Sequence, residues 1–349
     1  METRAKPRMS NIELLRIVAM ALIIASHLSY WGGAYFHTEG LDHFIASLFA
    51  TGGKLGVSLF VMIGSIFMAK KDMSCKAVLK IILITILVDS LMSVVMLVTG
   101  KGISIIGILY PLNKSWFVNV YLGLMLVSPW LNKLISVISY KRYRNLCVVL
   151  TIFCAIFPTI ILNGDFTNQP LWFVYLYLLT NFIIKYKAEI VSIKFWKLPC
   201  RVLSKTYLLL ALGVYVFLAY MVMCSDRFFP LRNSGSVIML FVALGLFIFL
   251  YHLKIGSSSL INWIAKGTFV AYLIHDNGRF KDFLWGELLK CNLWYNSPHF
   301  LIFGFLTIAG ILLIGAIVGM VVEKIALYVL NIAAVKKLID KVDVAYQAE

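Results

Sequence analysis

The chain has 349 residues, of which 61% are hydrophobic and 14% are charged, and its mean hydropathy is +0.89. Soluble domains are less apolar and carry about a quarter charged residues, so a soluble single- or two-domain protein is excluded. The 32 Lys and Arg against 16 Asp and Glu give a net charge of +16. This excess fits either a nucleic-acid-binding protein or a membrane protein with unevenly charged loops.

Ten apolar segments have about the 20 residues that a helix needs to cross a roughly 30 Å hydrocarbon core. They lie at residues 12–31, 43–69, 77–99, 115–135, 145–163, 170–186, 206–224, 235–253, 258–277 and 300–322. The apolar stretch from Ile103 to Leu112 is too short to cross and is predicted to be interfacial. The sequence thus predicts an all-α, polytopic transmembrane helical bundle of about ten spans. It is predicted to be one domain over 1–349, with spans within 12–322, a short tail at 323–349 and no appended soluble domain.

The Lys and Arg residues are concentrated on one set of alternate loops. With the N-terminus inside, the inner basic segments are 4–8, 70–80, 133–144, 185–205, 254–266 and 324–341. The outer loops then carry only Lys101, Lys114, Arg227, Arg232, Arg279, Lys281 and Lys290. Positive residues favour the cytoplasmic side, so both termini are predicted to be cytoplasmic. This distribution explains the net charge without a nucleic-acid partner.

The first span has a basic flank, as signal peptides do. No small-residue cleavage site follows its apolar run, so it is predicted to be a retained helix. Among the six cysteines, Cys147 and Cys154 are predicted to be core residues, whereas Cys75 and Cys200 are placed on the reducing inner side. Cys224 and Cys291 fall on outer segments, where a disulfide is conceivable and free thiols are the alternative.

Arg16 and His27 are ionisable residues of the first span, and such residues are candidates for function because they are costly in a membrane. Their separation of eleven residues turns a helix by about 1100°, which is about 20° past three turns, so both lie on one face, roughly 16 Å apart along the axis. Glu13 precedes Arg16 by three residues and is predicted to pair with it. The alternatives are that Arg16 extends to the inner interface and that His27 is a hydrogen-bonded core histidine.

Lys54 lies in the middle of the second span, in a run of small residues from Gly52 to Gly56 that permits close helix packing. The run lacks the spacing and the strand of a phosphate-binding loop. Lys54 is therefore a candidate anion ligand or a member of a buried ion pair. Asp89, in the third span, is the most obvious counter-charge, and a purely structural role for Asp89 is the alternative.

Aromatic and histidine side chains gather at the predicted outer ends of the spans. Trp116 and Tyr121 begin the fourth span, and His275 ends the ninth, followed by Asp276. Interfacial aromatic belts and interfacial hydrogen bonding are the alternative explanations. The remaining outer histidines are His37, His43 and His299. No two of them have ligand spacing on one helix, so no metal site is predicted, and His252 is interpreted as a cap.

These motifs, in this order, resemble the acyltransferase-3 family of bacterial membrane O-acyltransferases. The resemblance rests on Asn-Ile-Glu-Leu-Leu-Arg16 with His27, on the run from Lys54 to Ser65, on Trp116-Phe117 leading to Tyr121, on Ser128-Pro129-Trp130, and on Tyr272-Leu-Ile-His275. Two departures concern the donor side. Gly64-Ser65 reverses the usual Ser-Gly, and Lys76 and Lys80 replace an arginine pair, which keeps the charge but loses bidentate phosphate contacts.

The resemblance implies transfer of an acyl group, usually acetyl, from cytoplasmic acyl-CoA to a hydroxyl of an envelope glycan or glycolipid precursor, in the bacterial cytoplasmic membrane. His27 is the expected base or transient acyl acceptor, and Lys54 the expected oxyanion stabiliser. The expected donor-binding residues are Arg16, Lys70, Lys71, Lys76 and Lys80, and the expected acceptor-binding residues are Trp116, Tyr121 and His275. No permanently bound cofactor is expected, because acetyl-CoA or another acyl-CoA is a substrate.

A multi-span transporter or flippase for a glycan-related substrate is the rival hypothesis. Ten spans with scattered intramembrane charge suit both classes of protein. No internal repeat relates residues 1–170 to 171–349, which counts mildly against the inverted-repeat transporters. Transfer of acetyl groups from acetyl-CoA by the purified protein would distinguish the two.

Overall fold

The computed structural model describes residues 9–70, 74–102, 115–162, 168–187, 200–233 and 235–347, and within them every regular element is a helix. The α-helices are α1 (Ser10–Tyr30), α2 (Ala34–His37), α3 (Gly40–Met68), α4 (Cys75–Val98), α6 (Trp116–Val137), α7 (Tyr140–Thr151), α8 (Phe157–Ile160), α9 (Gln169–Lys185), α11 (Cys200–Cys224), α12 (Val237–His252), α13 (Ser259–Lys266), α14 (Thr268–His275), α15 (Phe300–Leu330) and α16 (Ala333–Gln347). A π-helical turn, η2 (Ile152–Ile156), joins α7 to α8, and η3 (Asp226–Arg232), η4 (Phe283–Leu288) and η5 (Cys291–Trp294) are short turns.

Each predicted span coincides with a helix or a pair of helices, but the number ten is not confirmed. Seven helical segments in the described part of the chain are long and apolar enough to cross a membrane, and η3 with α12 raises the number to eight. The predicted span 170–186 is the 17-residue α9, and the predicted span 258–277 is broken into α13 and α14. α15 continues to Leu330, beyond the predicted end at 322. The predicted interfacial stretch 103–112 lies outside the described residues.

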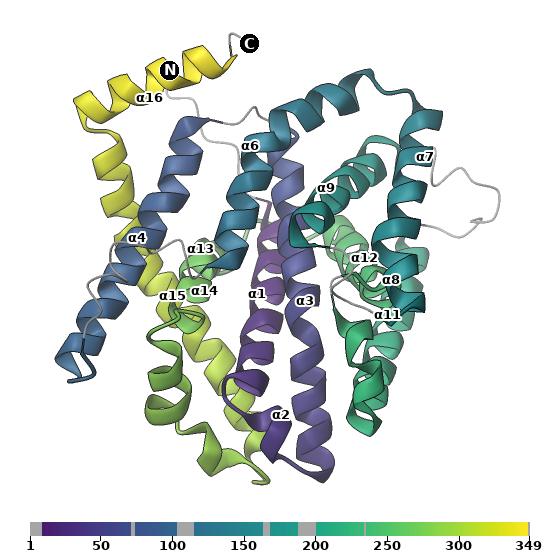
Figure 1. The fold of residues 1–349 in the computed structure, drawn as a ribbon, viewed down its shortest axis with the longest axis vertical. Helices are drawn as coiled ribbons and strands as arrows, with labels where there is room; N and C mark the ends of the chain where they lie inside the picture. Colours follow the sequence, from purple (N-terminus) through teal and green to yellow (C-terminus); the bar gives the residue numbers. More distant parts are fainter. Residues whose placement is uncertain are drawn as a thin grey trace.

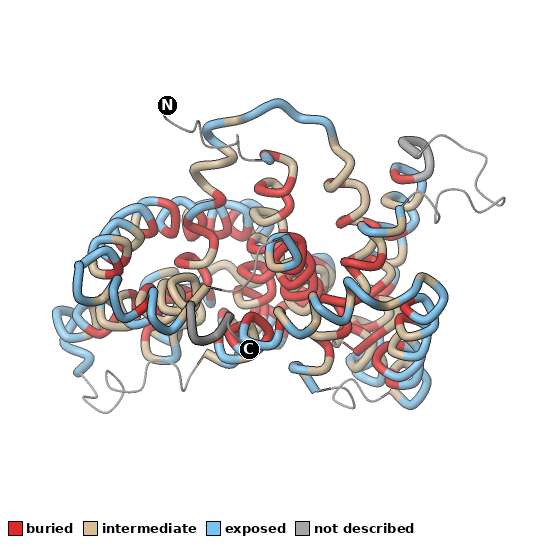
Figure 2. Tube along the Cα trace, turned by 90° about the horizontal axis from the view of Figure 1, so that it is seen from above, coloured by how far each residue is buried: buried red, intermediate tan, exposed pale blue. Residues whose placement is uncertain are grey.

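The helices lie side by side around α1 and α3, which are central in the bundle (Figure 1). Seen along the bundle, buried residues face the interior and exposed residues form the outer rim (Figure 2). α1 and α3 can approach closely because residue 56 is a glycine. A Cβ at this position would lie only 2.4 Å from the carbonyl oxygen of Ala19. The small residues around Lys54 thus serve the close packing that the sequence predicts, and they bring Lys54 to the level of the outer half of α1.

The two ends of the bundle carry different elements. α16 and the beginning of α4 lie at one end, and α2 lies at the other (Figure 1). We call these the inner and outer ends, after the orientation predicted from the basic loops; the cytoplasmic position of the termini stays a prediction. At the outer end Cys224 is exposed and Cys291 buried, and both are free, so the conceivable disulfide is absent from the structure.

Gly267 separates α13 from α14 and lets α14 pack directly on α15. A Cβ at Gly267 would lie 2.2 Å from the Cα of Ala316, and a Cβ at Gly315 would lie 2.8 Å from the Cα of Ala271. The two backbones therefore touch, as small residues allow in membrane bundles. This contact fixes α14, whose last residue is His275.

Candidate functional site

Arg16 and His27 lie on one uninterrupted helix, α1, so their separation of roughly 16 Å along the axis is retained. Arg16 Nη1 donates to Glu13 Oε2 at 2.9 Å, which confirms the predicted pair. The Arg16 guanidinium also lies 5.8 Å from the centre of the Phe67 ring, where α3 ends. Arg16 is thus held at the inner end, about half the length of α1 from His27.

A cavity of about 560 Å³ opens beside Arg16 at the inner end. Its wall includes Arg16, Ser74, Lys80, Tyr121, Lys266 and Glu323, and its apolar end includes Phe60 and Phe117. The lining therefore combines three cationic side chains with an apolar interior. Such a cavity suits a ligand with an anionic head and an apolar arm.

The structure separates the cations that the sequence groups as donor-binding. Lys80 lines the cavity, where it forms an ion pair with Glu323, whereas Lys76 donates to Asn331 Oδ1 at 2.7 Å and does not line it. Lys70 is exposed at the end of α3. Lys71 lies outside the described residues. Sequence reasoning missed Lys266, although it is the last residue before the conspicuous Gly267.

The second group of polar residues lies at the outer half of the bundle. The His27 and His275 rings are 5.0 Å apart, and His27 Nδ1 lies 3.7 Å from Asp276 Oδ1. His275 is fully buried, with Nδ1 2.6 Å from the carbonyl oxygen of Ala271. Trp285 Nε1 donates to the His275 carbonyl at 3.3 Å. The sequence offered one clue to Asp276, its position directly after His275, but no clue that His27 lies beside it.

Lys54 points toward the same outer group. Its Nζ lies 4.5 Å from the centre of the Trp116 ring, a cation–π contact, and it lies within electrostatic range of His27. The counter-charge expected for Lys54 has a different partner, because Asp89 Oδ2 pairs with Arg279 Nη1 at 3.6 Å. Trp116 and Lys54 therefore belong to one constellation with His27, whereas Asp89 belongs to the adjacent turn.

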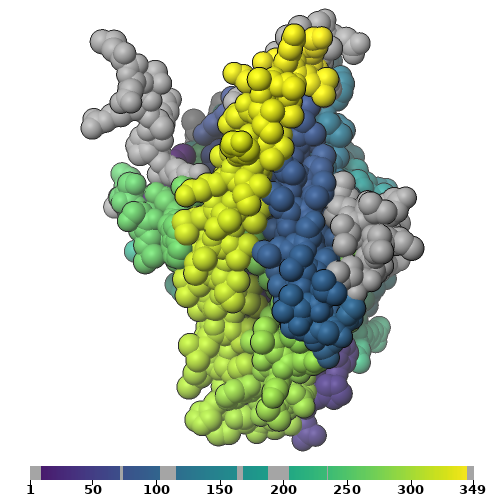
Figure 3. All heavy atoms as spheres, turned by 90° about the vertical axis from the view of Figure 1, so that its left-hand side faces the viewer, coloured from purple at the N-terminus to yellow at the C-terminus, as the bar shows by residue number. Residues whose placement is uncertain are grey.

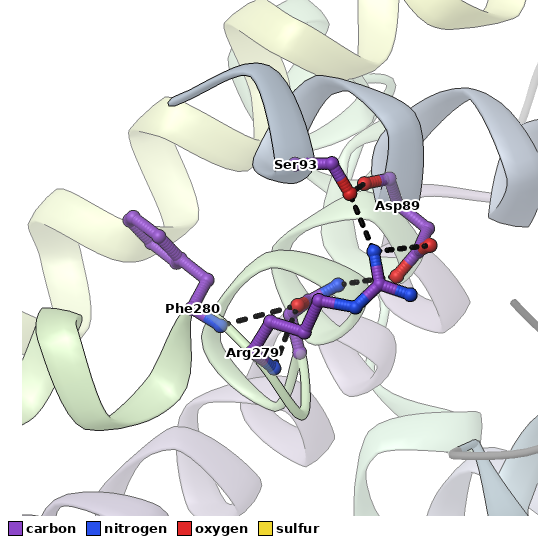
Figure 4. Close-up of polar contacts among 5 residues, drawn as sticks. Asp89, Ser93, Arg279 and Phe280 are labelled. Carbon is purple, nitrogen blue, oxygen red and sulfur yellow. Dashed lines mark hydrogen bonds and ion pairs between the residues drawn. The ribbon is translucent and has the colours of Figure 1, made fainter. Parts of the chain in front are cut away.

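The turn after α14 is anchored to α4 by the network in Figure 4. Asn277 Nδ2 donates to Asp89 Oδ1 at 3.0 Å, and Arg279 Nη1 donates to Ser93 Oγ at 2.6 Å. Asn277 Oδ1 accepts from the backbone N–H groups of Arg279 and Phe280 at 3.1 and 3.2 Å. The network fixes the turn that begins with Asp276, so Asp89 positions the carboxylate that faces His27.

An aromatic layer separates the inner cavity from the histidine pair. Phe117, in the cavity wall, has its ring 5.4 Å from that of Tyr272, which is 6.0 Å from His275. Tyr121 stacks on Phe117 at 5.6 Å and lines the inner cavity. The structure thus places Tyr121 on the inner side of the layer, not on the outer side expected from the sequence, because one helical turn from Phe117 carries it inward along α6.

The chain matches the acyltransferase domain family over residues 9–318. No curated protein matches the chain. No solved structure matches it either. The matched region contains Arg16, His27, Lys54, Trp116 and His275, and it ends within α15. An inner basic cavity and an outer histidine pair are thus found on a chain that, on this match, belongs to the acyltransferase-3 family.

Proposed function

We propose that this membrane acyltransferase transfers an acetyl group from cytoplasmic acetyl-CoA to a hydroxyl of an envelope glycan, or of its lipid-linked precursor, in the bacterial cytoplasmic membrane. The observation that carries the proposal is the arrangement along α1: a basic cavity at Arg16 and a histidine pair at His27, separated by one aromatic layer. The spacing of roughly 16 Å is comparable to the reach of a pantetheine arm.

The donor enters the inner cavity with its phosphates toward the inner end. Arg16 and Lys266 are the lining cations that attract the phosphates. Lys80 adds to this attraction, although it is also paired with Glu323. The apolar end at Phe60 and Phe117 then receives the arm, and the thioester passes the Phe117–Tyr272 layer. Movement of these two rings would connect the cavity with His27.

His27 acts on the acceptor hydroxyl. The Asp276 carboxylate beside Nδ1 favours the tautomer that carries its proton there, which leaves Nε2 to accept a proton. As the hydroxyl proton moves to His27, the acceptor oxygen bonds to the thioester carbonyl carbon. The carbon–sulfur bond then breaks, and the CoA sulfur leaves with the proton returned by His27. A positioned base is typically worth about 10²- to 10⁴-fold in rate.

Lys54 stabilises the negative charge that develops on the carbonyl oxygen. Its ammonium is held over Trp116 and acts on the same region as His27. In a site poor in water a fixed cation is worth more than in bulk solvent. His275 packs against His27 and confines it, so that its ring meets the acceptor in one orientation.

The experiment is transfer of radiolabelled acetyl from acetyl-CoA by the purified protein to envelope glycans. His27→Ala is expected to abolish transfer at normal membrane abundance. His27→Gln retains hydrogen bonding but cannot act as a base at neutral pH, and it is expected to be equally inactive. Substantial transfer by the Gln variant would exclude the base role, and glycan transport without acetyl transfer by the unaltered protein would favour the rival transporter.

A further inference from the structure

A half-exposed aromatic ring and a cation meet at the outer edge of the histidine pair. Trp31 caps α1 one turn after His27, with 49% of its surface exposed and its ring 6.3 Å from that of His27. Lys281 Nζ lies 3.6 Å from the centre of the Trp31 ring. The Lys281 ammonium covers one face of the indole, and the half-exposed remainder of the ring, next to the reacting histidine, is a surface on which a sugar ring can pack.

Lys281 differs from Lys101 and Arg279, two cations of the outer half that are paired with carboxylates. Lys101 forms an ion pair with Glu287, and Arg279 forms one with Asp89. Among the described residues, Lys281 forms no ion pair with a carboxylate within 4 Å, although it acts electrostatically on both His27 and Asp276. Its positive charge is therefore available to an anionic ligand, and it is directed at the place where the proposed chemistry occurs.

The backbone of Lys281 is fixed before any ligand arrives, and its ammonium rests on the Trp31 ring. Its backbone N–H donates to the Asn277 carbonyl at 2.9 Å, and Asn277 is anchored to Asp89 on α4. A preorganised cation binds an anion more tightly than a mobile one, because less conformational entropy is lost.

We propose that Trp31 and Lys281 form the acceptor subsite and that they select a sugar with a negative charge, a carboxylate or a phosphate, close to the acetylated hydroxyl. This inference rests on the proposed function and names its substrate class. The sugar ring packs on the part of the Trp31 indole that Lys281 leaves uncovered, while its anionic group binds the Lys281 ammonium, so the hydroxyl faces His27 one turn away.

Three soluble probes test the charge preference: methyl β-D-glucuronopyranoside, glucose 6-phosphate and the neutral methyl β-D-glucopyranoside. Binding to the purified protein is measured by saturation-transfer NMR, and acetyl transfer from acetyl-CoA is measured in parallel. The unaltered protein is expected to bind at least one anionic probe about tenfold more tightly than the neutral one, the size of one charge-assisted hydrogen bond. The glucuronide and the phosphate arms distinguish the two anions.

Lys281→Gln is expected to abolish this preference and leave binding of the neutral probe unchanged, and Lys281→Arg to retain it. Trp31→Ala is expected to weaken the binding of all three probes. Lys290→Gln, at an exposed outer lysine, is the matched control and is expected to retain the preference for the anionic probes. Equal binding of charged and neutral probes, no binding of any, or an equal loss for all in Lys281→Gln would overturn the subsite. Selective, Lys281-dependent binding without acetyl transfer would instead contradict the proposed function.

Discussion

Lys54, whose ammonium lies over Trp116, is expected to affect membrane insertion and activity in opposite directions. Lys54→Met removes a charge whose insertion costs about 2.5 to 3.5 kcal/mol at the centre of a span. Membrane abundance is therefore expected to be kept or raised. Acetyl transfer is expected to fall, because the cation that faces the His27 region is lost. Quantitative immunoblotting and the transfer assay measure the two effects, and full activity in this variant would assign Lys54 to structure alone.

Arg232 is a buried cation of a different kind. It is only 3% exposed, and its charge interacts with the Tyr35 hydroxyl and the Asp226 carboxylate. The guanidinium lies 3.9 Å from the ring centre of Phe229, 4.8 Å from that of Tyr35 and 5.2 Å from that of Tyr30. The aromatic cage replaces hydration, and it connects η3 with the outer end of α1.

The aromatic cage around Arg232 predicts an order of stability for two variants, Arg232→Lys and Arg232→Met, that differs from the order expected from charge alone. Arg232→Lys is expected to lower the melting temperature more than Arg232→Met, because ammonium is more strongly hydrated and cannot stack its plane on the rings. Methionine keeps the ring contacts without a buried charge. Thermal unfolding of the detergent-purified variants measures the order, and a lysine variant as stable as the parent would show that the charge, not the planar group, matters here.

Local sequence spacing predicted some of these residue contacts and missed others for a physical reason. The Glu13–Arg16 pair follows from a separation of three on one helix. The contacts of His27 with Asp276, and of Asp89 with Arg279, join residues that are far apart in the chain. No periodicity encodes which loop meets which span, so only the folded structure shows that Asp89 serves the turn after α14.

At the scale of elements, hydropathy located the helices but not the break at Gly267. The segments on both sides are apolar, so a hydropathy window joins them, whereas the packing of α14 on α15 separates them. Gly267→Ala would place a Cβ 2.2 Å from the Cα of Ala316 and force α14 with His275 to move. Transfer activity and melting temperature are both expected to drop.

Gly310→Ala is the matched control for Gly267→Ala. It lies on α15, and no described atom would lie within 4 Å of the new Cβ. The variant is expected to be as stable as the parent or slightly more stable, since alanine favours helices over glycine by about 1 kcal/mol. If the two variants behave alike, the contact between α14 and α15 is not what positions His275.

The C-terminal helix α16 joins the inner end of α4 to that of α15. Figure 3 shows α15 and α16 in yellow against α4 in blue. Asp343 Oδ1 accepts from the backbone N–H of Cys75 at 2.6 Å, at the positive end of the α4 dipole. Because Ser74 and Lys80, at the beginning of α4, line the inner cavity, α16 supports one wall of it.

Asp343→Ala is therefore expected to raise the KM for acetyl-CoA severalfold with little change in kcat. The lost contact is a charge-assisted hydrogen bond, worth about 1.5 to 3 kcal/mol when fully expressed. Asp340→Ala, at an exposed position on the same helix, is expected to leave both constants unchanged. Initial rates over a range of acetyl-CoA concentrations measure the effect, and a fall in kcat alone would place the influence of α16 elsewhere.

For the whole molecule, composition predicted a polytopic helical bundle correctly, because long apolar segments have few alternatives in a membrane. Hydropathy does not determine the number of spans, because a helix buried within the bundle can be shorter than a full span. The 17-residue α9 is such a helix, and its Trp172, Phe173 and Tyr175 are fully buried. The orientation rests on the basic loops alone, so it needs a test of its own.

Cysteine labelling provides this test. Cys224 is exposed at the outer end, whereas burial raises the pKa of the Cys291 thiol to about 12, so Cys291 stays protonated and unreactive near pH 8. A membrane-impermeant maleimide is therefore expected to label intact cells, and Cys224→Ser to abolish the signal. Lys337, on α16, is exposed. In the Cys224→Ser variant, a second substitution, Lys337→Cys, is expected to add no labelling in intact cells. After permeabilisation the double variant is expected to be labelled more strongly than Cys224→Ser alone. Labelling of Lys337→Cys in intact cells would reverse the orientation, place the Arg16 cavity on the outer side and contradict its proposed role in binding a cytoplasmic donor.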